Sequence, residues 1–400
     1  MKHIIILLVL LVQFVQASTL TLKQVLASAN ENQTLTQALD KERLYLEAKN
    51  LADTSMDPAE LYGAGTKAYP IDGRKNGNEY TVGISKTLPL GNTQEQDERI
   101  NRLNNEAYLL EEERKVLSFE NSMKSLYHQH CLDQQNYRSF KQNYQEFVTL
   151  YQKKEKAYRY QEISKTELMQ LEIEKNRLHA KLQEMQTVQV VSKQKLLILG
   201  RINHSDKTAL SCSDMYPIRE SVQLKEEPFA LSKEAHEKRI QSTQTALNRY
   251  SKAVDTVSLS VQYDQEIDID KYSVGISVPL SFTGRRSEQE RVAAMHKNSA
   301  IGFQYEQMMA EKKSIFLTLQ STLRNSAVMI RSLKKDLDTY KKELLPLVKR
   351  SYDLGESSVI EYLMNRQQYH QLNQELFAIQ KDYYQTLFAL YTLSESKENQ

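Results

Sequence analysis

The chain has 400 residues, a formal net charge of +2, and only 11 glycines and 7 prolines. So few turn-forming residues argue against several compact globular domains and favour long elements. A mean hydropathy of −0.60 and the absence of tryptophan are typical of extended, solvated helices with a narrow apolar stripe. The near-neutral charge gives no reason to expect nucleic acid as a partner.

The N-terminus has the pattern of a secretory signal peptide over residues 1–17. A basic start precedes an unbroken apolar run from Ile4 to Val12, and small residues follow up to Ala17. This run is shorter than the roughly 20 residues that a membrane-spanning helix needs. We therefore expect cleavage after Ala17 and export of the mature chain.

The mature chain then divides into two similar repeats, 18–205 and 225–395, with a linker at 206–224 and a tail at 396–400. Each repeat reads as a helix, a β-hairpin, a very long helix, a tight turn and a helix. In the first repeat the expected elements are a helix from about 21 to 54, a hairpin at 60–90, a long helix at 92–154 and a helix at 164–200. In the second repeat they are a helix at about 228–254, a hairpin at 256–282, a long helix at 284–350 and a helix at 357–395.

The expected helix lengths predict how each repeat packs. At about 1.5 Å per residue, the helix at 92–154 is roughly 95 Å long, and the two shorter helices of that repeat total roughly 105 Å. In the second repeat, too, the long helix is about as long as the two shorter helices together. Each repeat therefore predicts one long helix packed against two shorter helices, and leucine stripes at 3-4 spacing indicate packing of the coiled-coil kind.

Both hairpins contain nearly the same sequence motif, Tyr80-Thr-Val-Gly-Ile-Ser in the first and Tyr272-Ser-Val-Gly-Ile-Ser in the second. An apolar face and a face of small polar residues, alternating over about ten residues, are typical of a transmembrane β-barrel strand. A soluble edge strand is the alternative. The side chains expected to face lipid are Tyr80, Val82, Ile84, Leu88, Tyr272, Val274, Ile276, Val278 and Leu280.

Four strands per chain do not close a barrel, and unpaired strand edges are not tolerated in lipid. We therefore expect the chain to oligomerise through its sheet. Three copies supply twelve strands, a number within the known range of membrane barrels.

The chain resembles the TolC-like outer-membrane efflux proteins (the outer membrane factor family) over nearly its whole mature length. The resemblance depends on the duplicated strand motif with its Pro-Leu end, on Pro346, and on the segment that begins Tyr352-Asp-Leu-Gly-Glu-Ser-Ser. It implies a mainly α fold with a membrane β-barrel: a homotrimer whose twelve-stranded barrel stands on a long α-helical coiled-coil tunnel. It also implies the outer membrane of a Gram-negative bacterium, with a large periplasmic portion.

The resemblance further implies a passive channel in a tripartite efflux system for small molecules or metal cations. Its implied partners are a periplasmic adaptor (membrane fusion) protein, an inner-membrane efflux pump and outer-membrane lipid. Type I protein secretion and a non-conducting structural or adhesive coiled-coil protein are the alternatives, and the sequence does not identify the cargo.

The resemblance implies that a periplasmic gate lies at the two turns that join the helices of each repeat. The residues expected at the gate and its selectivity ring are Glu361, Glu167 and Tyr352, with Tyr352 and Glu167 as a hydrogen-bonded latch. Those expected at the adaptor-contacting tip are Tyr158, Gln161, Ser164, Gly355, Ser357 and Ser358. A solvated helix glutamate is the alternative for Glu361.

Three positions depart from the family pattern. At the tip, Gln161 stands where relatives often have glycine. At the latch, Ser357 stands where relatives have an arginine and Met364 where they have a second acidic residue, so we expect a latch that is weaker or differently built.

The sequence shows no nucleotide-binding loop, catalytic triad or paired-carboxylate motif, so we expect neither enzyme activity nor a cofactor. His128, His130 and Cys131 resemble a metal cluster, but helix positions two apart point to different faces, so no metal site is expected. The two cysteines, Cys131 and Cys212, fall in different expected elements. Two free thiols are the expected state, and a disulfide in an oxidising periplasm is the alternative.

Overall fold

The structure, a computed structural model, describes residues 19–396 apart from 32–33, 70, 72–75, 203–208, 223, 226, 253 and 280–285. The expected signal peptide and Leu280, one of the residues expected to face lipid, therefore lie outside the described residues. Within this described part, no helix is both long enough and apolar enough to cross a membrane.

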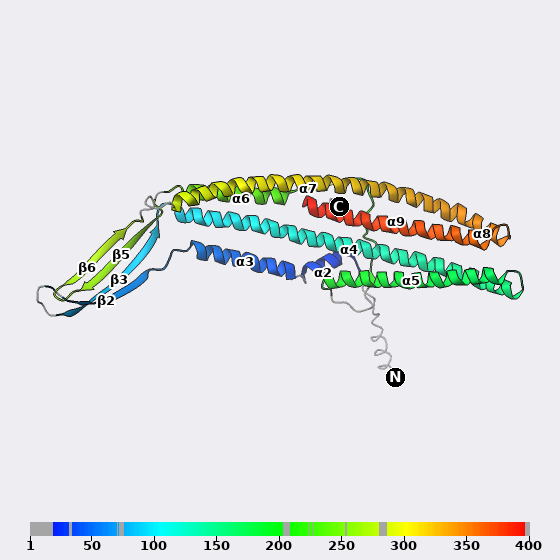
Figure 1. The fold of residues 1–400 in the computed structure, drawn as a ribbon, viewed down its shortest axis with the longest axis horizontal. Coiled ribbons are helices and arrows are strands. Elements are labelled where there is room, and N and C mark those ends of the chain that lie inside the picture. Colours follow the sequence, from blue (N-terminus) through cyan, green and yellow to red (C-terminus); the bar gives the residue numbers. More distant parts are fainter. Residues whose placement is uncertain are drawn as a thin grey trace, which may run out of the picture. The chain divides into compact units, whose positions relative to one another are not determined.

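The fold is mainly α-helical with one four-stranded sheet, as predicted (Figure 1). In the first repeat the elements are α2 (Leu22–Glu31), α3 (Thr34–Thr54), β2 (Glu60–Ala68), β3 (Gly77–Pro89), α4 (Thr93–Arg159) and α5 (Lys165–Leu199). In the second repeat they are α6 (Ala230–Arg249), β5 (Thr256–Gln265), β6 (Asp270–Ser277), α7 (Arg286–Thr339), the π-helical turn η2 (Tyr340–Leu344), α8 (Leu345–Asp353) and α9 (Val359–Ser394).

The described chain forms two compact units, and each unit draws on both repeats. One unit comprises Met1–Gln37, Lys115–Pro228 and Lys313–Gln400, and the other comprises Ala38–Arg114 and Phe229–Lys312. Because the units cut across the repeats, the division into two repeats remains a sequence prediction about the organisation of the chain.

Each long helix contacts two shorter helices, one within each unit. In the second unit Asn105 of α4 bonds the carbonyl of Leu46 in α3 at 3.3 Å, and Lys312 of α7 bonds Ser232 of α6 at 2.6 Å. In the first unit α4 and α5 share one buried apolar cluster, and α7 and α9 share another. This is the pairing that the helix lengths predict.

The second long helix differs from the predicted element at 284–350. It divides into α7, the π-helical turn and α8, and the backbone N–H of Leu345 bonds the carbonyl of Tyr340 rather than one four residues back. Pro346 explains the change. Proline has no N–H to donate and its ring clashes with the carbonyl four residues earlier, and a π-turn widens the helix at that point. The opening helix expected at 21–54 is likewise divided, into α2 and α3, on either side of residues 32–33.

The four strands are antiparallel in the order β2-β3-β5-β6, so the two predicted hairpins join into one sheet. Val82 lies opposite Tyr263 across the β3–β5 pair, and Val261 lies opposite Val274 across the β5–β6 pair. Within this described sheet, β2 and β6 are edge strands, each with one side of its backbone unpaired by another strand.

One face of the sheet is apolar and exposed. Val274 is 80% exposed and Ile276 is 71% exposed, values that are unfavourable in water for large apolar side chains. Leu88 is half-buried. The other side chains expected to face lipid, all exposed in the single chain, are Tyr80, Val82, Ile84, Tyr272 and Val278.

The opposite face is polar and hydrogen-bonded across strands. Thr81 donates to Asp264 at 2.7 Å, and Tyr62 donates to Gln262 at 2.9 Å. The ring of Tyr62 crosses Gly83 so closely that a Cβ there would lie 2.3 Å from a ring carbon. In the first hairpin, the glycine of the repeated motif is therefore explained by the close packing of the Tyr62 ring against it.

The linker expected at 206–224 contributes a strand that the sequence did not predict. β1 (Thr19–Leu20) pairs in parallel with β4 (Ala209–Leu210). The segment after β4 then packs on α4, where Tyr127 donates to the carbonyl of Ser211 and the backbone N–H of Tyr216 donates to Nε2 of His128 at 2.9 Å.

Cys131 and Cys212 form a disulfide, with their Cα atoms 5.5 Å apart. The expectation of two free thiols is therefore wrong. The cysteines are 81 residues apart in the sequence, and they meet because the segment after β4 returns to the middle of α4. Cys131 is fully buried in the cluster that α2, α4, α5 and this segment share.

Candidate gate at the helix turns

The two turns that join α4 to α5 and α8 to α9 are built alike. Ser164 caps α5 by accepting the backbone N–H of Glu167 at 3.1 Å, and Ser358 caps α9 by accepting that of Glu361 at 3.2 Å. Serine followed three residues later by glutamate is the sequence of a capping box. Each glutamate thus lies in the first turn of its helix, where the helix dipole favours a negative charge.

The helix ends before the turns also match. Gln161 and Gly355 both have left-handed backbones, with φ of 63° and 76°. The amide after each of them bonds back five residues at 2.9 Å, which is the Schellman pattern of a helix end. Gln161 thus adopts the conformation for which a glycine is suited, at a cost of about 1 kcal/mol.

Tyr352 of α8 and Glu167 of α5 form a direct link between the repeats. The Tyr352 hydroxyl donates to Oε1 of Glu167 at 2.5 Å, and Tyr352 is only 4% exposed. Burial and the Glu167 carboxylate raise the pKa of Tyr352 well above its ordinary value, so the hydroxyl stays a donor. The structure therefore brings together two of the three residues expected at the gate.

Three further residues support this link. Lys154 Nζ lies 3.8 Å from Oε1 of Glu167 and 3.9 Å from the ring centroid of Tyr352, so one ammonium group contacts both partners. The ring of Tyr362 stacks on Tyr352 with centroids 4.9 Å apart, and Arg366 donates to the Tyr362 hydroxyl at 3.0 Å. Sequence reasoning missed these residues because lysine, tyrosine and arginine at helix positions carry no signal without their partners.

The third residue expected at the gate, Glu361, lies apart from this link. Its side chain is exposed, as are those of Ile360 and Met364 beside it. The six residues expected at the tip all lie at or next to the two turns. Ser357 is half-buried, and the exposed ones are Tyr158, Gln161, Ser164, Gly355 and Ser358.

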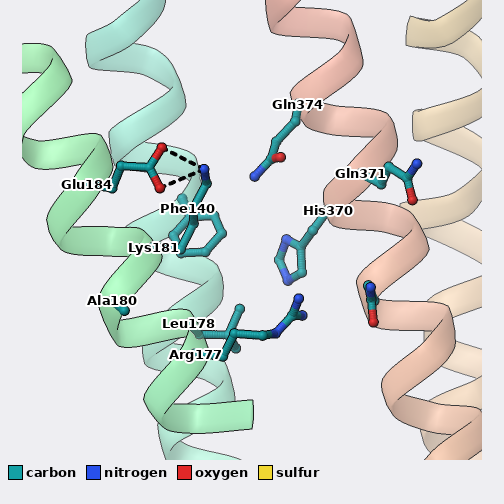
Figure 2. A pocket seen from close by; sticks show the side chains of 10 residues that line it. Phe140, Arg177, Leu178, Ala180, Lys181, Glu184, His370, Gln371 and Gln374 are labelled. Atoms are coloured by element: carbon teal, nitrogen blue, oxygen red, sulfur yellow. Dashed lines mark hydrogen bonds and ion pairs between the residues drawn. The ribbon is translucent and has the colours of Figure 1, made fainter.

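A separate cavity of about 530 Å³ lies among α4, α5 and α9. Figure 2 shows Arg177 of α5 and His370 and Gln374 of α9 directed into the space between these helices. Burial lowers the pKa of His370 to about 4, so its ring is neutral at pH 7, and its Nε2 has no hydrogen-bond partner among the described residues. Lys181 at the cavity wall pairs with both oxygens of Glu184 at 2.8 Å.

His128, His130 and Cys131, the residues that resemble a metal cluster in the sequence, each contact other groups. Cys131 is in the disulfide, and Nδ1 of His128 lies 2.7 Å from the carbonyl of Lys124. His130 Nδ1 lies 3.0 Å from the hydroxyl of Ser192. In the part of the chain that the structure describes, no three histidine, cysteine or acidic side chains are grouped to hold a metal ion.

Two hairpins in one sheet, long helices that pack against shorter ones, and two similar helix turns joined by the Tyr352–Glu167 hydrogen bond define the class: the chain has the fold of the TolC-like outer-membrane channels. Vibrio cholerae VceC, an outer membrane protein, is 14% identical, with a TM-score of 0.73 over 94% of this chain and 96% of that chain. The Campylobacter jejuni CmeC outer membrane channel is 14% identical, with a TM-score of 0.72 over 93% of this chain and 85% of that chain. The open state of the Neisseria gonorrhoeae MtrE outer membrane channel is 13% identical, with a TM-score of 0.64 over 94% of this chain and 89% of that chain.

At these identities the likeness concerns the fold. No family model matches the sequence, and no curated protein matches it. The similar structures of CmeC, OprN and MtrE are of outer membrane channels.

Proposed function

We propose that the chain is the outer-membrane channel-tunnel of a tripartite efflux system in a Gram-negative bacterium. In this proposal it is a passive duct and a homotrimer, whose barrel lies in the outer membrane and whose helices extend into the periplasm. Energy for transport comes from an inner-membrane pump, to which a periplasmic adaptor connects the channel. The cargo class that the gate supports best is small molecules or metal cations.

The observation that carries this proposal is the sheet. Its apolar face is exposed in the single chain, its polar face is hydrogen-bonded, and its edge strands β2 and β6 remain open. Pairing β2 of one copy with β6 of the next removes every open edge and turns the apolar face outward into lipid. Three copies then form twelve strands.

The gate supports a regulated conduit rather than a static coiled coil. The bond between Tyr352 and Glu167 ties the second repeat to the first at the turns, where a ring of helices would narrow. A hydrogen bond to a charged partner is strong enough to hold one state and weak enough to be broken by a docking partner. The exposed turns offer the adaptor its contact.

The exposed Glu361 carboxylates supply the preference for cations. In a trimer three copies of this side chain surround the entrance, and a ring of carboxylates attracts cations and repels anions. Glu361 lies close to the N-terminus of α9, so its position is fixed by the cap that Ser358 provides.

The test is planar-bilayer recording on protein purified from the outer-membrane fraction. We expect discrete single-channel currents with a preference for cations, and a smaller preference in the Glu361→Gln variant, which keeps the side-chain shape and removes the charge. Absence of current from wild type and from variants that weaken the gate would favour the non-conducting structural reading instead.

A further inference from the structure

We propose that the cavity among α4, α5 and α9 binds a small amphipathic organic carboxylate. The cavity lies within the helices, apart from the turns and the sheet, and all its lining residues belong to one compact unit of the chain. It is therefore complete in a single copy, and the inference does not depend on the proposed channel function.

The cavity is large enough for an organic ligand. Its volume is about 530 Å³, and small-molecule sites usually measure about 300–1,000 Å³. A single buried water needs only about 10–15 Å³. The space therefore suits an organic molecule, and the residues around it indicate which kind.

The clearest sign of a ligand is His370 of α9. The residue is only 8% exposed, and Figure 2 shows its ring directed into the cavity. Its Nε2 has no hydrogen-bond partner among the described residues, although leaving a buried polar nitrogen unpaired is unfavourable. Burial lowers the pKa of His370 to about 4, so at pH 7 the neutral ring can carry its proton on Nε2 and donate it to a ligand.

Two further side chains offer hydrogen-bond donors to the same space. Arg177 of α5 bonds Glu174 through Nε and Nη2, at 2.8 and 2.7 Å, and its Nη1 has no hydrogen-bond partner in the described part of the chain. The side chain of Gln374 lies one helical turn after His370 and also points into the cavity (Figure 2). Its amide likewise forms no hydrogen bond with another described residue.

The carboxylates near these donors already have partners. Both oxygens of Glu184 accept from Lys181 at 2.8 Å, and both oxygens of Glu174 accept from Arg177. A cation in the cavity would have to compete with Lys181 for Glu184. A carboxylate instead meets the available donors of His370 and Arg177, and hydrogen bonds between charged partners are the strong ones.

An apolar surface lies beside the donors. Phe140 of α4 and Leu178 of α5 are both buried and belong to the apolar cluster that these two helices share. The ring centroid of Phe140 is 5.5 Å from that of His370. A ligand with an aromatic ring can therefore pack on Phe140 while its carboxylate bonds the donors, which favours an amphipathic carboxylate over an inorganic anion.

The test is isothermal titration calorimetry of the full-length protein in detergent with a naphthalene carboxylate. The corresponding carboxamide has the same ring and no charge. We expect saturable binding of one carboxylate per chain, about 10- to 100-fold tighter than binding of the carboxamide. Both compounds also enter detergent micelles, so Gln374→Trp, whose larger side chain fills the cavity, measures this background.

Two variants assign the donors. Arg177→Gln removes the cation and His370→Leu removes the ring nitrogen, and each should weaken binding of the carboxylate by about 10-fold or more. The matched control is Arg43→Gln, which breaks a similar pair with Glu47 in α3 and should bind as wild type does. Because the Arg177 side chain is 50% exposed, Arg177→Gln gives a result even if His370→Leu does not fold.

Three results would each overturn the proposal. They are binding to wild type that does not exceed that of the filled Gln374→Trp variant, equal affinity for the carboxylate and the carboxamide, and unchanged affinity in Arg177→Gln. The first would mean that the cavity holds only water. None of them bears on the proposed channel, which is tested by its currents.

Discussion

The hydroxyl of Tyr352 and the carboxylate of Glu167 join α8 to α5 across the two sequence repeats, with an oxygen–oxygen distance of 2.5 Å. Tyr352 is almost fully buried, and Lys154 contacts both partners. A hydrogen bond between a buried donor and a charged acceptor stabilises the turns strongly through a single pair of atoms. Removing one hydroxyl group is therefore enough to test it.

Tyr352→Phe keeps the ring and its stacking on Tyr362 and removes only the donor. Hydrogen bonds to charged groups contribute about 1.5–3 kcal/mol. We therefore expect the ratio of closed to open entrance to fall by about 10- to 100-fold. Single-channel recording should show larger or more frequent openings. Tyr160→Phe is the control, since Tyr160 is 79% exposed, and equal behaviour of the two variants would contradict the latch.

The disulfide between Cys131 and Cys212 predicts a measurable loss of stability when it is removed. Replacing both cysteines with serine is expected to cost about 2–4 kcal/mol, because a cross-link spanning 81 residues restricts the unfolded chain. The loss is read as a lower midpoint of thermal unfolding by circular dichroism. Reducing agent should lower the midpoint of wild type and leave the double variant unchanged; an identical response of the two proteins would rule out the bond.

The buried His128 predicts that stability falls with acidity. Burial lowers its pKa to about 4, and its Nε2 accepts the backbone N–H of Tyr216, so the folded state needs the neutral ring. Between about pH 6.5 and pH 4 the unfolded chain binds a proton that the folded chain does not. The contribution of His128 to the free energy of unfolding is therefore fully present above this pH window and is lost as pH falls through it. The total loss is roughly 3 kcal/mol.

The measurement is urea unfolding of His128→Gln and wild type in detergent between pH 7 and pH 4.5. The amide oxygen keeps an acceptor for Tyr216 but does not titrate, so the variant should lose less stability on acidification. His296→Gln, at an exposed position of α7, is the control and should follow wild type. His130 and His370 have similarly lowered pKa values, so they contribute to the pH dependence of the free energy of unfolding in both proteins. The difference between the two proteins therefore reports on His128.

The two faces of β6 predict opposite outcomes for the same substitution. Val274 lies on the apolar face, and its neighbour Ser273 points to the other face of the strand. Lysine on the lipid face of a barrel costs about 2–4 kcal/mol near the membrane centre. Val274→Lys should therefore reduce trimer in the outer-membrane fraction, while Ser273→Lys should leave it largely intact. Equal yields of trimer would count against a lipid-facing sheet.

Much of the fold was predictable because its signals are periodic and local. Alternation along Tyr80, Val82 and Ile84 indicated a strand with two distinct faces, and the structure exposes these three on one face. The long helices were predictable from the scarcity of glycine and proline. These patterns depend only on residues close in sequence.

What the sequence did not predict depends on distant contacts. Cys131 and Cys212 come together through a parallel strand pair that involves only two residues on each side, too short to leave a pattern. The π-turn before Pro346 changes the hydrogen bonding within a helix, and the spacing of apolar residues does not predict such a change. Lys154 belongs to the latch only because α4, α5 and α8 converge there.

The central claim is that identical chains complete one another's sheets. Native mass spectrometry of the full-length protein, extracted from the outer membrane in detergent, tests it most directly. The account predicts a particle of three chains that persists when the detergent is exchanged. A stable single chain, soluble once the detergent is removed, would contradict it.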